Sequence, residues 1–186
     1  MNRPPDLPRH FVLAALALAA GLALPALPGR AGTELVQFPA DYRAKFALYS
    51  WTERPDRKPA IVRYYYVNPE AAAAAKAGQP APNGTVLIME DRKVRLGADG
   101  APERAPNGTF MATDEVTGLF VQEKRAGWGA DYPAEKRNGE WEYAQFNPDG
   151  TRRANANLDG CFACHKNRTG RDYNFTFSKW VLDGKP

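Results

Sequence analysis

Short apolar runs separated by turn sequences are the clearest pattern along the chain. The run at 61–67 is β-branched and aromatic, which predicts a strand. Three more strands are predicted at 85–94, 116–124 and 139–146, with Asn-Gly and Asp-Gly pairs marking turns between the runs. This succession predicts an α+β fold, with a mainly antiparallel β-sheet and a few helices in a single domain.

Two helices are predicted in the first half of the chain. Aromatic residues recur every three or four positions between residues 38 and 49, which indicates an amphipathic helix beginning near Pro39. An alanine-rich segment at 69–77 predicts a second helix, with Asn68 as its N-cap and Gly78 just past its end. The chain is therefore expected to carry its helices around the sheet.

The N-terminal residues 1–31 have the organisation of a secretory signal peptide. A basic start is followed by an apolar Ala/Leu-rich run at 11–24 and by small residues that predict cleavage after Ala31. The alternative is a transmembrane anchor, but a span needs about 20 apolar residues and prolines interrupt this run. We expect a mature domain of residues 32–186, exported and with no membrane segment after cleavage.

The net charge of the chain excludes few classes of function. Lys and Arg number 25 against 21 Asp and Glu, which gives a formal net charge of +4. The basic residues are scattered along the sequence and form no patch, so no nucleic-acid partner is expected.

The pentapeptide Cys161-Phe162-Ala163-Cys164-His165 is the attachment signature of a c-type haem. Cysteines three positions apart lie on one helical turn, where each thiol can add to a haem vinyl group. The adjacent His165 can then bind the iron. These are the only cysteines of the chain, so the motif uses both.

Other readings of a Cys-x-x-Cys pair fit the sequence less well. A zinc site needs about four ligands, and the chain has only two histidines in addition to its two cysteines. A thioredoxin-like pair should follow a strand, whereas loop-forming residues 155–160 precede this motif. Haem is attached to such motifs outside the bacterial cytoplasm, so the signal peptide and the motif together predict a periplasmic haem protein.

The second histidine, His10, lies in the predicted signal peptide. Cleavage would leave His165 as the only histidine, which excludes two histidine ligands from one mature chain. The sixth position of the iron is then empty, or it is filled by Met89, Met111, a lysine amine or a ligand from outside.

The late position of the haem motif and the strand-rich pattern resemble the cytochrome P-460 family, which includes the β-sheet form of cytochrome c′. The resemblance is carried, in this order, by residues 38–42, 63–69, 83–90, 137–143, 161–165 and 172–177. It implies a single haem-binding domain, often a homodimer, with one covalent haem c, His165 as proximal ligand and an open distal side. Some members oxidise hydroxylamine, using a lysine cross-linked to the porphyrin and a distal carboxylate. Others lack the cross-link and bind nitric oxide.

Three residues are candidates for a role in the chemistry. Lys93 is the only lysine on the strand that carries the cross-link in the oxidising members, although Met89, Glu90 or Asp91 can also be the equivalent position. Arg63 is a candidate for hydrogen bonding a haem propionate or a bound ligand. Glu90, together with Asp159, is a candidate for the distal carboxylate.

Three functions stay open at this point. The first is a haem protein that binds or redox-processes small nitrogen species such as nitric oxide. The second is a hydroxylamine-oxidising enzyme with a lysine–porphyrin cross-link, and the third is an electron carrier with a methionine as sixth ligand. The expected partners are a small-molecule ligand or substrate, a redox partner protein and a second copy of the chain. In some family members the stretch just before the haem motif supplies the distal carboxylate. Here residues 152–157 contain no acid, which weighs against the hydroxylamine-oxidising enzyme.

Overall fold

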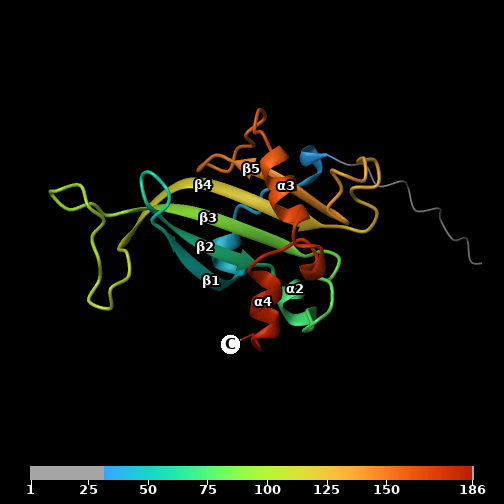
Figure 1. Cartoon of the computed structure of the whole chain (residues 1–186), viewed down its shortest axis with the longest axis horizontal. Helices are drawn as coiled ribbons and strands as arrows, with labels where there is room; N and C mark the ends of the chain where they lie inside the picture. Colours follow the sequence, from blue (N-terminus) through green and yellow to red (C-terminus); the bar gives the residue numbers. More distant parts are fainter. Residues whose placement is uncertain (1–31, 186) are drawn as a thin grey trace, which may run out of the picture.

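The computed structural model of the chain describes residues 32–185, whose centre is a five-stranded antiparallel sheet (Figure 1). The strands lie side by side in sequence order, so that every connection joins neighbours. The α+β prediction is therefore confirmed. The strands are β1 (Ala47–Arg54), β2 (Ile61–Val67), β3 (Val86–Val94), β4 (Ala112–Lys124) and β5 (Trp141–Phe146).

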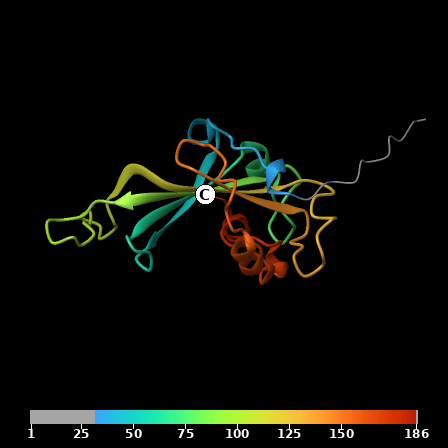
Figure 2. The ribbon, with the colours of Figure 1, turned by 90° about the horizontal axis from the view of Figure 1, so that it is seen from above.

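Short helices lie on both faces of this sheet. Figure 2 shows the N-terminal segment and the C-terminal helices on opposite sides of it. None of the helices described for residues 32–185 has the length and hydropathy that a membrane span needs. The helices are η1 (Thr33–Leu35), α1 (Tyr42–Lys45), α2 (Pro69–Ala74), α3 (Asp159–Lys166), η2 (Thr169–Arg171) and α4 (Phe177–Leu182).

Alternation along the strands gives the sheet an apolar cluster on each face. On β3, Leu87 packs into the cluster under α2 and α4, whereas Ile88 packs into the cluster under α1 and the N-terminal segment. Both faces are thus covered, which explains why residues 61–67, apart from Arg63, and residues 86–89 are apolar or aromatic with little alternation.

The predicted strands are found close to their expected positions, but the first predicted helix is wrong over most of its length. Only α1 forms, because Phe46 takes an extended conformation and the chain continues as β1. Tyr49 therefore lies on strand β1, at the irregularity between Leu48 and Ser50 in the pairing of this strand with β2. The second helix, α2, ends at Ala74, before the expected Gly78. The predicted signal peptide and His10 lie outside the described residues.

The connection between β3 and β4 is a long arm at residues 95–111. Two isolated β-bridges, Leu96 with Pro102 and Arg104 with Phe110, fold it back on itself. Figure 1 shows this arm extending away from the sheet, on the side remote from α2 and α4. Phe110 packs onto the sheet at the base of the arm.

Candidate haem site

A cavity of about 630 Å³ lies between one face of the sheet and the segment that runs through α3 to Thr176. Ligand sites in proteins typically enclose roughly 300–1,000 Å³. Alternate side chains of the central strands face this cavity, as the period of two in a strand requires. The sheet side chains that line it include Arg63, Tyr65, Leu87, Met89, Asp91, Phe120, Gln122 and Tyr143.

Helix α3 brings both cysteines and the histidine of the motif to this cavity. It begins where the Asn157 side chain accepts a hydrogen bond from the Asp159 amide, at 3.0 Å. One turn later, Cys161 is partly buried and Cys164 is exposed, and both thiols are free. Burial raises the pKa of Cys161, so this thiol is held in its protonated form.

The loop before β5 holds α3 against the sheet. The Asn138 side chain donates a hydrogen bond to the Phe162 carbonyl at 2.9 Å and another to the Tyr143 hydroxyl at 3.1 Å. At the other end of the helix, Lys166 donates to two carbonyls of the same loop. The position of the motif over the cavity is thus fixed by contacts with β5 and its preceding loop.

The imidazole of His165 has one nitrogen engaged and one available. Its Nδ1–H donates to the backbone carbonyl of Tyr173 at 2.6 Å, which leaves Nε2 with a free lone pair. The ring is held between Tyr143 and Phe175, each with its ring centroid 5.0 Å away. Burial lowers the pKa of His165, which favours the neutral form that binds metals.

These residues fit a covalently held haem. The cavity has two free thiols and one imidazole on the α3 wall, and a sheet wall opposite that combines apolar and aromatic side chains with a few polar ones. Within residues 32–185, no group of three or more His, Cys, Asp or Glu side chains is placed to hold a bare metal ion. The donor set therefore suits a porphyrin iron better than zinc.

A buried ion pair supplies the polar groups of the sheet wall. Arg63 Nε and Nη2 donate to the two carboxylate oxygens of Asp91 at 2.6 and 2.7 Å. Their side chains are only 8% and 10% exposed. The Arg63 guanidinium also lies 5.9 Å from the ring centre of Phe120. The pair is therefore rigid, because both its geometry and its packing are fixed.

The structure brings only one of the three candidate residues for chemistry to the cavity, namely Arg63. Lys93 lies at the end of β3, away from the lining residues, and forms an ion pair with Glu115. Glu90 points to the opposite face of the sheet, where Tyr42 and two arginines donate to its carboxylate. Neither side chain is thus placed to act at a bound haem.

Of the other positions considered, Met89 lines the cavity, whereas Met111 lies at the base of the arm and Asp159 at the start of α3, both outside the lining. Sequence reasoning missed Asp91 as the carboxylate of this site. The link between them is the strand register, which no local pattern contains: Arg63 and Asp91 are direct partners across β2 and β3. It also missed Gln122, whose side-chain amide reaches the site across the sheet. Tyr173 was missed because it acts through its backbone carbonyl, which every residue has.

Comparison with known proteins supports the same assignment. A search among curated proteins found no match for the chain. The profile of one protein family, described as Cytochrome P460, matches residues 39–176, a span that includes the sheet, the cavity and the haem motif. The chain therefore belongs to the cytochrome P460 family of haem-binding cytochromes.

Proposed function

We propose that the protein is a periplasmic mono-haem c-type cytochrome that binds or redox-processes small nitrogen species such as nitric oxide. Cys161 and Cys164 would hold the haem through thioether bonds, and His165 Nε2 would ligate its iron. The observation that carries the proposal is that these three residues share one wall of a 630 Å³ cavity. Among the described residues that line it, no lysine and no second histidine is present.

The bound haem would supply an iron that takes a diatomic ligand and changes oxidation state by one electron. The protein supplies the surroundings. Met89 and Phe120 present an apolar wall, which excludes water from a bound ligand. Arg63, held by Asp91, is a fixed hydrogen-bond donor of the sheet side of the cavity and would orient the polar end of a ligand.

Hydroxylamine oxidation with a lysine–porphyrin cross-link is less well supported. The cross-link needs a lysine at the porphyrin edge, and the Lys93 amine is instead ion-paired with Glu115 in a half-exposed position. Electron transfer with a methionine ligand is the stronger alternative, because the Met89 side chain lines the cavity. A thioether at the sixth position would close the iron to added ligands.

The proposed location is the periplasm, and the proposed assembly is a homodimer. A signal peptide at residues 1–31 would place the domain of residues 32–186 in the periplasm, where haem attachment takes place and a redox partner protein would reach it. Two copies of the chain are proposed to form a homodimer, as the family resemblance implies.

Optical spectroscopy of the protein made with a cytochrome maturation system tests these functions. We expect a mass higher than that of the processed chain by one haem, a five-coordinate ferrous spectrum, and a shift of the Soret band on addition of nitric oxide. Lys93→Ala should leave all three unchanged, whereas Arg63→Leu should increase the dissociation rate of nitric oxide roughly tenfold, by loss of one hydrogen bond.

Colourless protein with the mass of the bare polypeptide would contradict haem attachment. A six-coordinate, low-spin ferrous spectrum that ignores nitric oxide, and that becomes five-coordinate in Met89→Leu, would favour the electron carrier. A spectral change in Lys93→Ala would favour the cross-linked enzyme.

A further inference from the structure

Two consecutive residues after η2 have left-handed backbone conformations. Asp172 has φ 49° and Tyr173 has φ 56°, although neither is glycine. Such conformations are uncommon outside glycine, and the surrounding structure must hold them in place. The carbonyl of Tyr173 is the acceptor of the His165 Nδ1–H, so this distorted turn directly contacts the proposed iron ligand.

The Asp172 side chain ties this turn to the rest of the fold. Its Oδ2 accepts hydrogen bonds from the Ala81 amide at 2.9 Å and from Lys124 Nζ at 2.8 Å. Lys124 also donates to the Ala81 carbonyl at 3.0 Å. The Asp172 and Lys124 side chains are 16% and 9% exposed, so solvent screens the pair only slightly.

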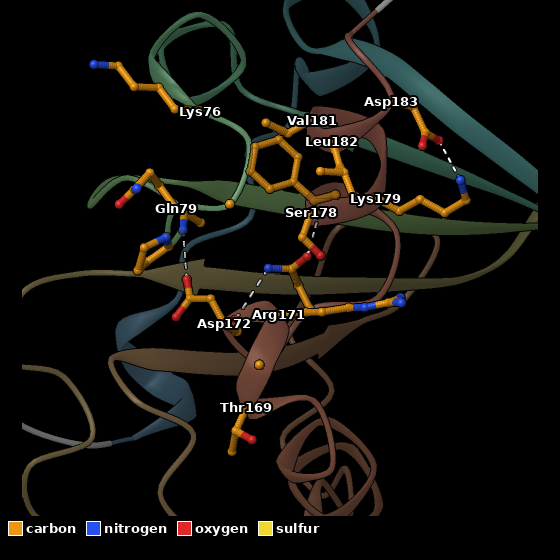
Figure 3. A pocket seen from close by; sticks show the side chains of 16 residues that line it. Lys76, Gln79, Thr169, Arg171, Asp172, Ser178, Lys179, Val181, Leu182 and Asp183 are labelled. Atoms are coloured by element: carbon orange, nitrogen blue, oxygen red, sulfur yellow. Dashed lines mark hydrogen bonds and ion pairs between the residues drawn. The ribbon is translucent and has the colours of Figure 1, made fainter.

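Asp172 stands at the edge of a second cavity, of about 430 Å³, between the loop after α2 and helix α4 (Figure 3). The figure shows its carboxylate turned toward the loop that carries Gln79, away from Arg171. The turn that carries Tyr173 is thus anchored from outside the haem cavity, by β4 and the loop before β3.

The Tyr173 carbonyl has a second donor. Gln122 Nε2, on β4, donates to the same oxygen at 3.1 Å, while the His165 bond measures 2.6 Å. Two donors that share one acceptor weaken each other, because each withdraws electron density from the oxygen. The strength of the bond to His165 therefore depends on Gln122 as well as on the turn.

We propose that Asp172 is a positioning residue for the iron ligand. Held by Lys124 and the Ala81 amide, it fixes the Tyr173 carbonyl, which sets the orientation and electron donation of His165, and Gln122 moderates that donation. The inference rests on the haem ligation by His165 proposed above. Partners beyond the metal ligand fix its ring and raise its basicity.

The direction of the effect follows from the charge on iron. A stronger Nδ1–H···O bond makes the imidazole a better donor, which stabilises ferric iron and lowers the reduction potential. Asp172→Ala should free the turn, weaken this bond, raise the reduction potential and lower the Fe–His stretching frequency in the resonance Raman spectrum of the ferrous protein. Asp172→Asn keeps an acceptor for the Ala81 amide, so its shifts should be smaller.

Gln122→Leu provides a second, opposite test. Loss of its amide leaves the Tyr173 carbonyl to His165 alone, so the potential should fall and the Fe–His frequency should rise. Asp183→Ala is a matched control, because Asp183 lines the same outer cavity but is paired with the exposed Lys179. Neither quantity should change in that variant.

The outcomes separate this inference from the haem assignment. Protein without attached haem would contradict the proposed function. Haem-loaded Asp172→Ala that melts at a lower temperature, with an unchanged Fe–His frequency and potential, would show a merely structural role and overturn the inference. Shifts of the same sign in Asp172→Ala and Gln122→Leu would also overturn it.

Discussion

Glu142 is a buried carboxyl group of which only one oxygen has a hydrogen-bond partner among the described residues. Its side chain on β5 is fully buried. Tyr132 donates one hydrogen bond to its Oε2 at 3.0 Å, while its Oε1 forms none among the described residues. Burial raises the pKa of Glu142 to about 7, and the negative charge of Glu34 acts in the same direction. The folded protein therefore favours the protonated acid.

The pH dependence of stability should reflect this group. Because the folded pKa lies above the unfolded value of 4.5, the contribution of Glu142 is fully present below pH 4.5 and is lost as pH rises through 7. The free energy of unfolding of wild type should therefore fall as pH rises from 4 to 8, whereas that of Glu142→Gln lacks this contribution. The difference between variant and wild type should shift in favour of the variant by on the order of 3 kcal/mol over this range. Urea unfolding at several pH values measures this difference. A difference independent of pH, or one equal to that of the exposed Glu135→Gln, would contradict the assignment.

At the same scale, the sequence could name the proposed haem-binding residues because their chemistry depends on local spacing. Cys161, Cys164 and His165 lie within five residues of one another, and all three are carried by α3. The roles of Asp91 and Gln122 depend on register between strands, which a local pattern does not contain. The sequence could name Arg63 as a candidate but could not name its partner.

Among the elements, α1 is held by one residue of β3. The Glu90 carboxylate is fully buried and accepts hydrogen bonds from Tyr42 and Arg43 of α1 and from Arg92. Burial would raise the pKa of Glu90, but these hydrogen bonds outweigh it and the pKa is lowered. The four-residue helix α1, too short to be stable alone, is thus fixed to the sheet by charge.

Replacing this anchor should loosen α1. Glu90→Gln leaves two arginines without their carboxylate and should cost about 3 kcal/mol of unfolding free energy at pH 7. Because the folded pKa is lowered, the wild-type advantage is present above pH 4.5 and is lost as pH falls through the folded pKa. Hydrogen exchange of α1 and urea unfolding measure the effect. Lys45→Gln on the same helix breaks only an exposed pair and should cost less than 1 kcal/mol. Equal losses in both variants would contradict the role of Glu90.

The first predicted helix was wrong because its aromatic pattern runs across an element boundary. The aromatic residues at 38–49 recur with a helical period, but α1 ends at Lys45 and β1 begins at Ala47. Phe38 and Tyr42 pack together behind the sheet, while Tyr49 packs on Phe177 of α4 at the other face. The turns at 99–100 and 107–108 were predicted more accurately, because Asp-Gly and Asn-Gly pairs are specific and local signals.

At the scale of the whole molecule, the C-terminal segment from α3 to α4 (residues 159–182), here called the strap, lies over one face of the sheet. Helix α3 and the turn at 172–176 form one wall of the haem cavity, and α4 fastens the strap to the sheet through Phe177 and Val181. A cavity of 630 Å³ under this strap is costly when empty, because its lining loses packing contacts. Haem occupancy and overall stability should therefore be linked.

The linkage can be measured with the double variant Cys161→Ser/Cys164→Ser. Without thioether bonds the haem can be removed, and the purified haem-free protein should melt roughly 5–10 °C below the haem-loaded wild type, because the haem packs in the cavity and binds His165 only when the chain is folded. Calorimetry measures the midpoint. Wild type produced without haem maturation is the control and should melt with the variant. A variant as stable as the loaded protein would show that the cofactor contributes nothing to the fold.

The order of the strands and the strap along the chain has a consequence for biogenesis. All five strands precede α3, which begins only at Asp159. A growing or translocating polypeptide thus delivers its sheet before its two thiols. The sheet side of the cavity can therefore form before the α3 side, and Cys164 is still exposed in the folded chain. Enzymes that attach haem would then reach this thiol on a scaffold whose sheet is already made.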